Sequence, residues 1–404
     1  MEKITIQEIY KKKEKQKKEK NMYNTNLIKQ IYSSVNIVNI IKEKTELRKR
    51  GPLLYGLCPF HKEITPSFAV NPKTQRFHCY GCGADGNVFS FIMKRDCCSF
   101  QEAVTKLAEY AKLPVPINEK DVEIERKKNR LYQINDLACA FFYQKGRKNE
   151  KVIQYLKDDR KLTDETIKKF NLGVSGAYGL ELCAYLENKG CTKEEMIEAG
   201  LLGHDEERGR YYGKFWDRII FPIYNANKKI VGFGGRVIGE GTPKYLNSPE
   251  TIIFDKSHEL YGLHVAKTKN KPFILCEGFL DVISMHQAGF TSAVATLGTS
   301  LTYAQAQIIS KYTNTVFIAY DSDAPGIKAA VRAIPILEKM GLRVFVISAA
   351  PYKDVDELLR ADDDDHSETK NRFKRAISGT AFLVKQLDKT DPEKFYREAV
   401  NFLV

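Results

Sequence analysis

One segment of this chain, CPFHKEITPSFAVNPKTQRFHCYGC, limits its possible folds more than any other. It carries Cys58 and His61 as one close pair and Cys79 and Cys82 as another, with 17 residues between the pairs. Such pairs suit a closed tetrahedral zinc site, because each pair occupies a tight turn and both turns converge on the metal. Zinc prefers thiolate and imidazole ligands, and four protein ligands leave no open position for chemistry. The segment therefore predicts one structural zinc ion.

Two alternatives to this ligand set stay open at the level of sequence. His78 is a rival ligand, although its place directly before Cys79 makes it the poorer choice. The cysteines are otherwise explained as ordinary buried residues beside a surface histidine. Phe68, Phe77 and Tyr80 either stack on nucleic acid bases or pack in the core, and we favour the core for the two phenylalanines.

Composition favours an intracellular protein that contacts acidic polymers. The chain has 404 residues, of which 43% are hydrophobic, and this suffices for two or three domains with cores of their own. Its formal net charge of +13 suggests nucleic acid phosphates as partners, although the run KKKEKQKKEK (11–20) reads as a solvated tail. Nine cysteines give no sign of paired disulfides. We find no signal peptide and no membrane span, so we expect a cytoplasmic protein.

Helices are expected on both sides of the zinc segment. Apolar residues recur at helical spacing over 26–44, and FQEAVTKLAEYA (100–111) reads as a helix capped by Ser99. The charged stretch 118–130 reads as a linker or a solvated helix.

The second half of the chain alternates strands with helices. Strands are expected at 273–276, 292–297, 315–320 and 343–348, with helices starting near Leu280, Thr302 and Pro325. This alternation predicts a parallel sheet with helices on both faces. In such sheets, sites form at the carboxyl ends of the strands.

Acidic residues follow three of these strands. Glu277 follows the first, Asp321 and Asp323 the third, and Asp354 and Asp356 come shortly after the fourth. Carboxylates that converge on one edge repel one another unless a divalent cation lies between them. Magnesium prefers such oxygen ligands together with substrate phosphates, so the pattern favours metal-assisted phosphoryl transfer. Acidic residues also cap strand ends without any metal.

Longer motifs resemble a known family. CEGFLDVISMHQAGF (276–290) with AYDSDAPG (319–326) resembles the TOPRIM catalytic domain of primases, topoisomerases and some nucleases. The segment DRIIFPIYNANKKIVGFGGRVIGEGTPKYLNSPETIIFDKSHELYGL (217–263) resembles the basic half of the RNA polymerase domain of DnaG-type bacterial primases, and the zinc segment resembles their zinc ribbon. The resemblance runs in the family's order from about residue 26 to the end.

This resemblance implies a DNA primase, which synthesises short RNA primers on a single-stranded DNA template from ribonucleoside triphosphates. One structural zinc ion and one or two catalytic magnesium ions, with manganese as an alternative, are implied. Glu277, Asp321 and Asp323 match the family's magnesium ligands and catalytic acids, and three further acids match catalytic positions: Asp281, Asp354 and Asp356. The positions that match the nucleotide and template groove are Arg236, Lys244, Asn247 and Lys256. Each of these cations is otherwise an ordinary surface charge.

The resemblance also divides the chain, a multi-domain protein of the α+β and α/β classes. We expect a lysine-rich tail (1–25), a zinc-ribbon domain (26–113), a linker (114–130), a basic subdomain of the polymerase core (131–260), a TOPRIM parallel-sheet subdomain (261–366) and a helical segment (367–404). Family members usually continue into a helical domain that docks on the replicative helicase, and we expect that domain to be absent from this chain. A fragment and a natural short form encoded by a phage or mobile element both explain this.

Two other functions remain. A TOPRIM topoisomerase or nuclease would share Glu277, Asp321 and Asp323, but it would not need the PKYLNSPET block or the zinc segment. A primase-derived adaptor that binds single-stranded DNA without catalysis would bind DNA equally well after loss of Asp321 and Asp323. A fused helicase is excluded, because no G-x-x-x-x-G-K-[ST] loop is present.

Overall fold

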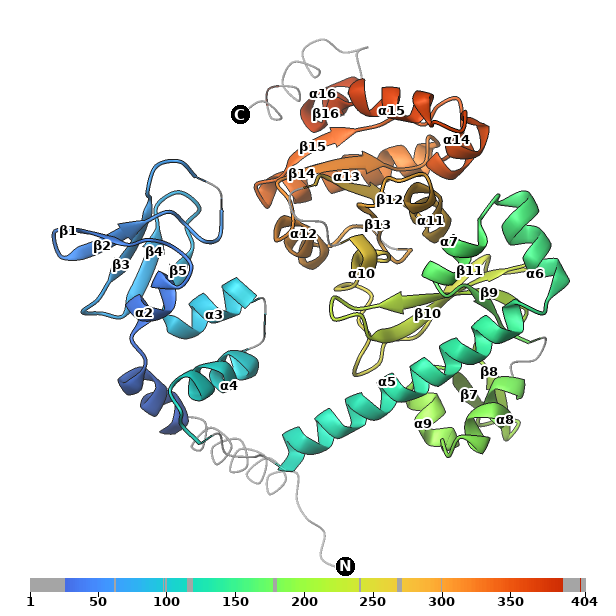
Figure 1. Ribbon diagram of the computed structural model, residues 1–404, viewed down its shortest axis with the longest axis horizontal. Helices are drawn as coiled ribbons and strands as arrows, with labels where there is room; N and C mark the ends of the chain where they lie inside the picture. Colours follow the sequence, from blue (N-terminus) through green and yellow to red (C-terminus); the bar gives the residue numbers. More distant parts are fainter. Residues whose placement is uncertain are drawn as a thin grey trace, which may run out of the picture. The chain divides into compact units, whose positions relative to one another are not determined.

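The computed structural model describes residues 26–61, 63–96, 98, 100–114, 119–176, 180–239, 241–266, 271–298, 300–387 and 400 (Figure 1). The chain separates into two compact units, Met1–Val122 and Glu123–Val404, each of which is described by itself. The predicted lysine-rich tail and the predicted cap Ser99 lie outside the described residues. Within the described part of the chain, no helix is both long and apolar enough to cross a membrane.

The first unit is a five-stranded antiparallel sheet with helices. The strands follow one another in chain order: β1 (Arg48–Arg50), β2 (Leu53–Gly56), β3 (Phe68–Asn71), β4 (Arg76–Cys79) and β5 (Asp85–Gly86). Helical residues 26–34 precede α2 (Ile37–Lys42), and α3 (Val88–Asp96) and α4 (Phe100–Tyr110) follow the sheet.

Two phenylalanines lie in the core of this unit. Phe68 and Phe77 are buried and their rings stack at 5.2 Å, so the prediction that they pack in the core is confirmed.

The helix expected over 26–44 is broken at residues 35 and 36. The side chain of Asn36 accepts a hydrogen bond from the amide of Val38 and so begins a new helix.

The second unit begins with mostly helical chain and a small antiparallel sheet. Its first elements are α5 (Glu119–Gly146), α6 (Glu150–Gln154), the π-helix η1 (Tyr155–Asp159), α7 (Asp164–Lys169), β6 (Gly173–Val174), α8 (Leu180–Asn188), α9 (Lys193–Glu198) and the hairpin β7 (Leu202–Asp205) and β8 (Arg210–Gly213). The sheet has the order β11-β10-β9-β6, with β9 (Arg218–Tyr224), β10 (Ile230–Val237) and β11 (Tyr245–Asn247). Residues 119–130 of the stretch read as a linker or a solvated helix are helical and belong to α5.

A mostly parallel sheet follows, as predicted. Its order is β13-β12-β14-β15-β16, and only β16 runs antiparallel to its neighbour. The strands are β12 (Phe273–Cys276), β13 (Ala293–Ala295), β14 (Thr315–Ala319), β15 (Arg343–Val346) and β16 (Ile377–Ser378). The helices are α10 (Leu263–Ala266), α11 (Phe279–Gln287), α12 (Tyr303–Ser310), α13 (Ala324–Lys339), α14 (Val355–Ala361), α15 (Ser367–Lys374) and α16 (Gly379–Lys385). The four predicted strands and the three predicted helix starts are confirmed to within a few residues.

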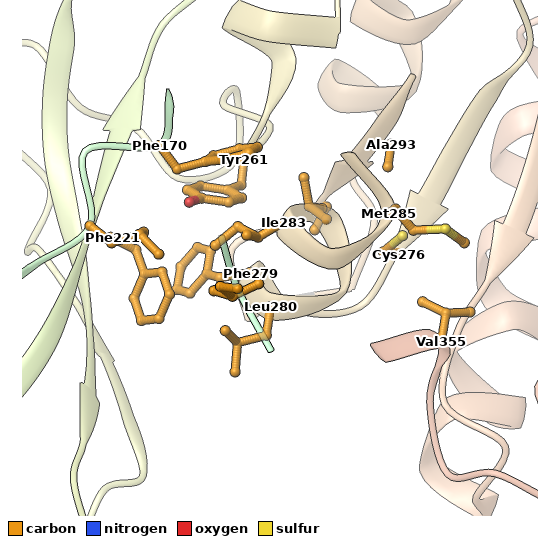
Figure 2. Close-up of a cluster of buried hydrophobic side chains, with 14 of the residues drawn as sticks. Phe170, Phe221, Tyr261, Cys276, Phe279, Leu280, Ile283, Met285, Ala293 and Val355 are labelled. Carbon is orange, nitrogen blue, oxygen red and sulfur yellow. The ribbon is translucent and has the colours of Figure 1, made fainter. Parts of the chain in front are cut away.

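A shared core joins the four-stranded and the five-stranded sheet of the second unit. Figure 2 shows Phe279 and Leu280, from the start of α11, beside Phe221 of β9. The Phe279 ring stacks on Phe221 at 5.2 Å and meets Tyr261 edge-on at 4.6 Å. Because Glu277 lies two residues before Phe279, this packing fixes the carboxyl end of β12 against the antiparallel sheet.

Candidate metal centre and acidic cleft

The four predicted zinc ligands meet at one point of the first unit. One ligand atom from each of Cys58, His61, Cys79 and Cys82 lies within 4.8 Å of all the others. The sulfur atoms of Cys58 and Cys82 are 3.8 Å apart, and the sulfur of Cys79 lies 3.8 Å from Nδ1 of His61. A tetrahedral zinc ion with Zn–S bonds of about 2.3 Å requires sulfur atoms about 3.8 Å apart. These residues therefore fit a closed structural zinc site. His78 is exposed and lies outside this set.

Glu63, which the sequence did not single out, holds both ends of this site. Its Oε1 accepts a hydrogen bond of 2.7 Å from the amide of Cys58, and its Oε2 lies 3.2 Å from Nε2 of His61. Nδ1 of His61 is therefore left for the metal. Ser67 donates its amide and its hydroxyl to the same carboxylate. Although burial opposes it, these hydrogen bonds lower the pKa of Glu63.

Glycine at position 81 is required by the same geometry. A Cβ there would lie 2.7 Å from Nε2 of His61 and 2.8 Å from Oγ of Ser67. The second cysteine turn therefore has room for the His61 ring and the Ser67 hydroxyl only without a side chain at Gly81.

A cleft of about 470 Å³ in the second unit collects most of the other predicted residues. Two strands of the antiparallel sheet supply one wall, with Arg236 from β10 and Tyr245 from β11. The carboxyl ends of the parallel strands supply the opposite wall, with Glu277 after β12 and Asp321 after β14. The predicted residues that line the cleft are Glu277, Asp281, Asp321, Asp354, Asp356, Arg236, Lys244 and Asn247.

Two predicted residues do not line this cleft. Asp323 caps α13, and its Oδ1 accepts a hydrogen bond of 2.9 Å from the amide of Gly326. Pro325 lies in the first turn of that helix and is accommodated there. Lys256 lies in the loop after β11, where its carbonyl accepts a hydrogen bond from the side chain of Gln305.

The acids of the cleft are crowded by like charge. Burial, with the charges of Glu277 and Asp354, raises the pKa of Asp321 to about 6. Burial and the neighbouring aspartates also raise the pKa of Asp281 well above its ordinary value, although the amide of Gly278 donates to its Oδ2. The amide of Asp321 donates to Glu277 at 3.3 Å. A divalent cation would relieve this repulsion, and carboxylate oxygens are its preferred donors. The residues present therefore fit a divalent metal.

Cations face these acids across the cleft. The guanidinium of Arg236 lies 5.2 Å from the centre of the Tyr245 ring and 5.4 Å from that of Tyr155. The charge of Arg236, together with burial, lowers the pKa of Lys244. Lys353 Nζ lies 3.7 Å from Oδ2 of Asp321. The arrangement offers positive charge to a phosphate chain directly beside carboxylates that suit a metal.

Several lining residues escaped the sequence analysis. Arg160, Tyr245, Lys353 and Arg360 all line the cleft. Lys353 could have been predicted from the sequence, because it directly precedes the acids of the last motif. Nothing in the local sequence distinguishes Arg160 from the other basic residues of its segment.

Comparisons with known proteins agree with this geometry. Family models match in three places: the CHC2 zinc finger over residues 23–123, the N-terminal domain of the DNA primase catalytic core over 141–267, and a Toprim-like domain over 274–359. The DNA primase of Clostridium acetobutylicum is 39% identical over 338 residues, which are 83% of this chain and 56% of that protein. The chain thus spans little more than half the length of this curated relative.

Solved structures extend the likeness to the fold. The zinc-binding and RNA polymerase domains of the Aquifex aeolicus primase are 31% identical, with a TM-score of 0.61 over 93% of this chain and 92% of that one. A DnaG primase catalytic domain bound to single-stranded DNA is 32% identical, with a TM-score of 0.60 over 68% of this chain and 89% of that one. The predicted resemblance is confirmed, and the chain belongs to the family of DnaG-type bacterial DNA primases, whose zinc-ribbon and TOPRIM polymerase domains it contains.

Proposed function

We propose that this chain is a DNA-directed RNA polymerase that synthesises short RNA primers on single-stranded DNA. The observation that carries the proposal is the single cleft in which Glu277 and Asp321 face Arg236 and Lys244. Carboxylates suited to a divalent metal beside cations suited to phosphate are what a nucleotidyl transfer site needs.

Each wall of the cleft has its own task. Glu277 and Asp321 would hold magnesium or manganese, supported by Asp354 and Asp281. Asp323, which caps α13 outside the cleft lining, is not among these ligands. A divalent cation held by these residues would supply the positive charge that activates the attacking hydroxyl and stabilises the leaving phosphate.

The basic wall binds the phosphates of the ribonucleoside triphosphate and of the template. Arg236, Lys244 and Lys353 do so through charge, without reading sequence. Asn247 is oriented by a hydrogen bond of 2.9 Å from its Nδ2 to the carbonyl of Leu297. Lys256 lies outside the cleft and binds template phosphates there.

The zinc unit adds a surface for single-stranded template. Strand register places Arg48 opposite Tyr55, and Ala69 lies between Tyr55 and His78, so the three larger side chains share the outer face of the sheet. Tyr80, at the end of β4, is 67% exposed and meets His78 edge-on. Aromatic side chains among cations are typical of surfaces that stack single-stranded bases.

The test separates chemistry from binding. In Asp321→Ala, primer synthesis from labelled ribonucleotides should fall about 10³-fold or more, because a metal contributes several kcal/mol to the transition state. Affinity for single-stranded DNA should stay within about twofold, because cations supply most of it. The exposed Asp158→Asn is the control for loss of one charge. Equal loss of synthesis and binding would contradict this division, and a wild-type chain that binds DNA without synthesis would favour the adaptor.

A further inference from the structure

Asp356 differs from the other acids of the cleft because both of its carboxylate oxygens are already used. The side chain is buried, with 1% of its surface exposed. Its Oδ2 accepts hydrogen bonds from Nη1 of Arg160 at 2.6 Å and from Nε of Arg360 at 3.2 Å. Its Oδ1 accepts from the hydroxyl of Ser284. A metal would have to compete with these three donors for a carboxylate that is almost fully buried.

The neighbouring aspartates are engaged on one side only. Asp354 caps α14 with Oδ1, which accepts from the amide of Glu357 at 2.8 Å. Asp281 uses Oδ2 for the amide of Gly278, and Asp321 faces Lys353 through Oδ2 at 3.7 Å. Among the described residues, each of these three aspartates therefore has one oxygen without a hydrogen-bond or ion-pair partner, whereas both oxygens of Asp356 accept hydrogen bonds.

What Asp356 holds in place is a cation of the cleft. Arg160 follows directly after the π-helix η1, and such helices are frequent at functional sites. Its Nε donates to the hydroxyl of Tyr155 at 2.8 Å, and its guanidinium carbon lies 5.2 Å from the centre of the same ring. Asp356 fixes the guanidinium from the other side. Tyr155 also contacts Arg236 with its ring, so the ring and the carboxylate together hold three arginines at the cleft: Arg160, Arg236 and Arg360.

The fixed guanidinium retains capacity for a ligand. Nε and Nη1 of Arg160 are used by Tyr155 and Asp356, and among the described residues no hydrogen bond to Nη2 is found. Arg160 lines the cleft together with Arg236 and Lys244. A planar guanidinium held rigid in this way suits the oxygen atoms of a phosphate group and loses little freedom on binding.

We infer that Asp356 is a positioning residue, which orients Arg160 and Arg360 toward the phosphates of a bound triphosphate and does not bind the divalent cation. The inference rests on the proposed function of the cleft and assigns a different task to one of its acids. The two arginines also compensate the buried negative charge of Asp356. Removing one partner of such a buried ion pair would leave the charge of the other uncompensated.

Calorimetric titrations with Mn²⁺ and with inorganic tripolyphosphate test the inference without any turnover. In Asp356→Asn, we expect Mn²⁺ affinity to stay within about twofold and tripolyphosphate affinity to fall about tenfold. Arg160→Gln should match that loss, and the double variant should lose no more than either single variant, because both changes remove one arrangement. Asp321→Asn should weaken Mn²⁺ binding, and the exposed Asp159→Asn is the control for charge.

Two results would overturn the inference. The first is a loss of Mn²⁺ affinity in Asp356→Asn as large as in Asp321→Asn. The second is an unchanged tripolyphosphate affinity in Arg160→Gln, a variant that remains informative if Asp356→Asn does not fold. A wild-type chain that makes no primers while the titrations behave as expected would contradict the proposed function and leave the positioning role intact.

Discussion

The zinc site and the acidic cleft have similar numbers of candidate ligand groups, but they differ in where these groups come from in the chain and in how close together they lie. The zinc ligands come from one short segment, and their atoms already lie within 4.8 Å of one another. The acids of the cleft come from the ends of separate strands, and their charges raise the pKa of Asp321 to about 6. Among the described residues, no acidic group of the cleft matches the close clustering of the zinc ligands. We therefore expect a zinc ion to stabilise the first unit, whereas the carboxylates of the cleft repel one another as long as no cation lies between them.

The largest effect should come from the zinc ligands. Cys79→Ser should release the metal and unfold the first unit, because a structural zinc contributes about 10–16 kcal/mol in small zinc domains. Zinc content and circular dichroism measure this loss. Fluorescence of Trp216, the single tryptophan and a residue of the second unit, should show that unit intact.

Cys98→Ser is the matched control, because Cys98 lies in the same unit but outside the ligand set. One zinc ion per chain in Cys79→Ser would show that the ligand assignment is wrong.

A smaller loss of zinc affinity is expected from a change at Glu63, which contacts two of the ligand residues. Glu63→Gln keeps the size of the side chain but places an amide among the donors from Cys58, His61 and Ser67. Zinc affinity should fall about 10–100-fold, as is usual when the partner of a ligating histidine is lost. Competition with a chromophoric chelator measures the affinity. Glu46→Gln, at an exposed glutamate that pairs with Arg48 and lies outside the ligand set, should bind zinc as the wild type does.

If the zinc affinity of Glu63→Gln were unchanged, Glu63 would not support the ligands, and zinc binding would depend on the four ligands alone.

A substitution of Asp321 in the cleft should raise the free energy of unfolding, whereas the substitutions at the zinc site destabilise the first unit. Asp321 has a native pKa of about 6 against an ordinary value of 3.8, so the native state binds the proton more tightly than the unfolded state. The unfolding free energy of the wild type therefore falls as pH rises from about 4 through 6 and then levels off. Asp321→Asn removes this cost and should stabilise the second unit by about 1–2 kcal/mol at pH 7.5.

Urea unfolding followed by Trp216 fluorescence, without added divalent cations, measures this gain. The gain should vanish at pH 4, where the wild-type carboxyl is protonated, and should shrink when Mn²⁺ is added. Destabilisation at pH 7.5, or an equal gain at both pH values, would mean that like-charge repulsion does not shape the cleft.

The same contrast explains which residues of the two sites could be predicted from the sequence. The zinc ligands were predictable because their spacing is local, and the strand at 273–276 because its apolar run is bounded by Pro272 and Glu277. Glu63 lay inside the quoted segment, but its link to His61 depends on the fold of two turns. Arg160 and Asp356 are 196 positions apart, and they meet only because the chain after η1 and the helix α14 come together in the folded unit.

The most direct test of the account is primer synthesis by the purified chain. Labelled ribonucleotides, mixed single-stranded templates and either Mg²⁺ or Mn²⁺ are supplied, with Glu277→Gln as the comparison. The account predicts short RNA products from the wild type, dependent on the metal and lost in Glu277→Gln, while both proteins bind zinc and template equally. Products of equal yield from Glu277→Gln, or no products from a wild type that retains zinc and binds template, would contradict it.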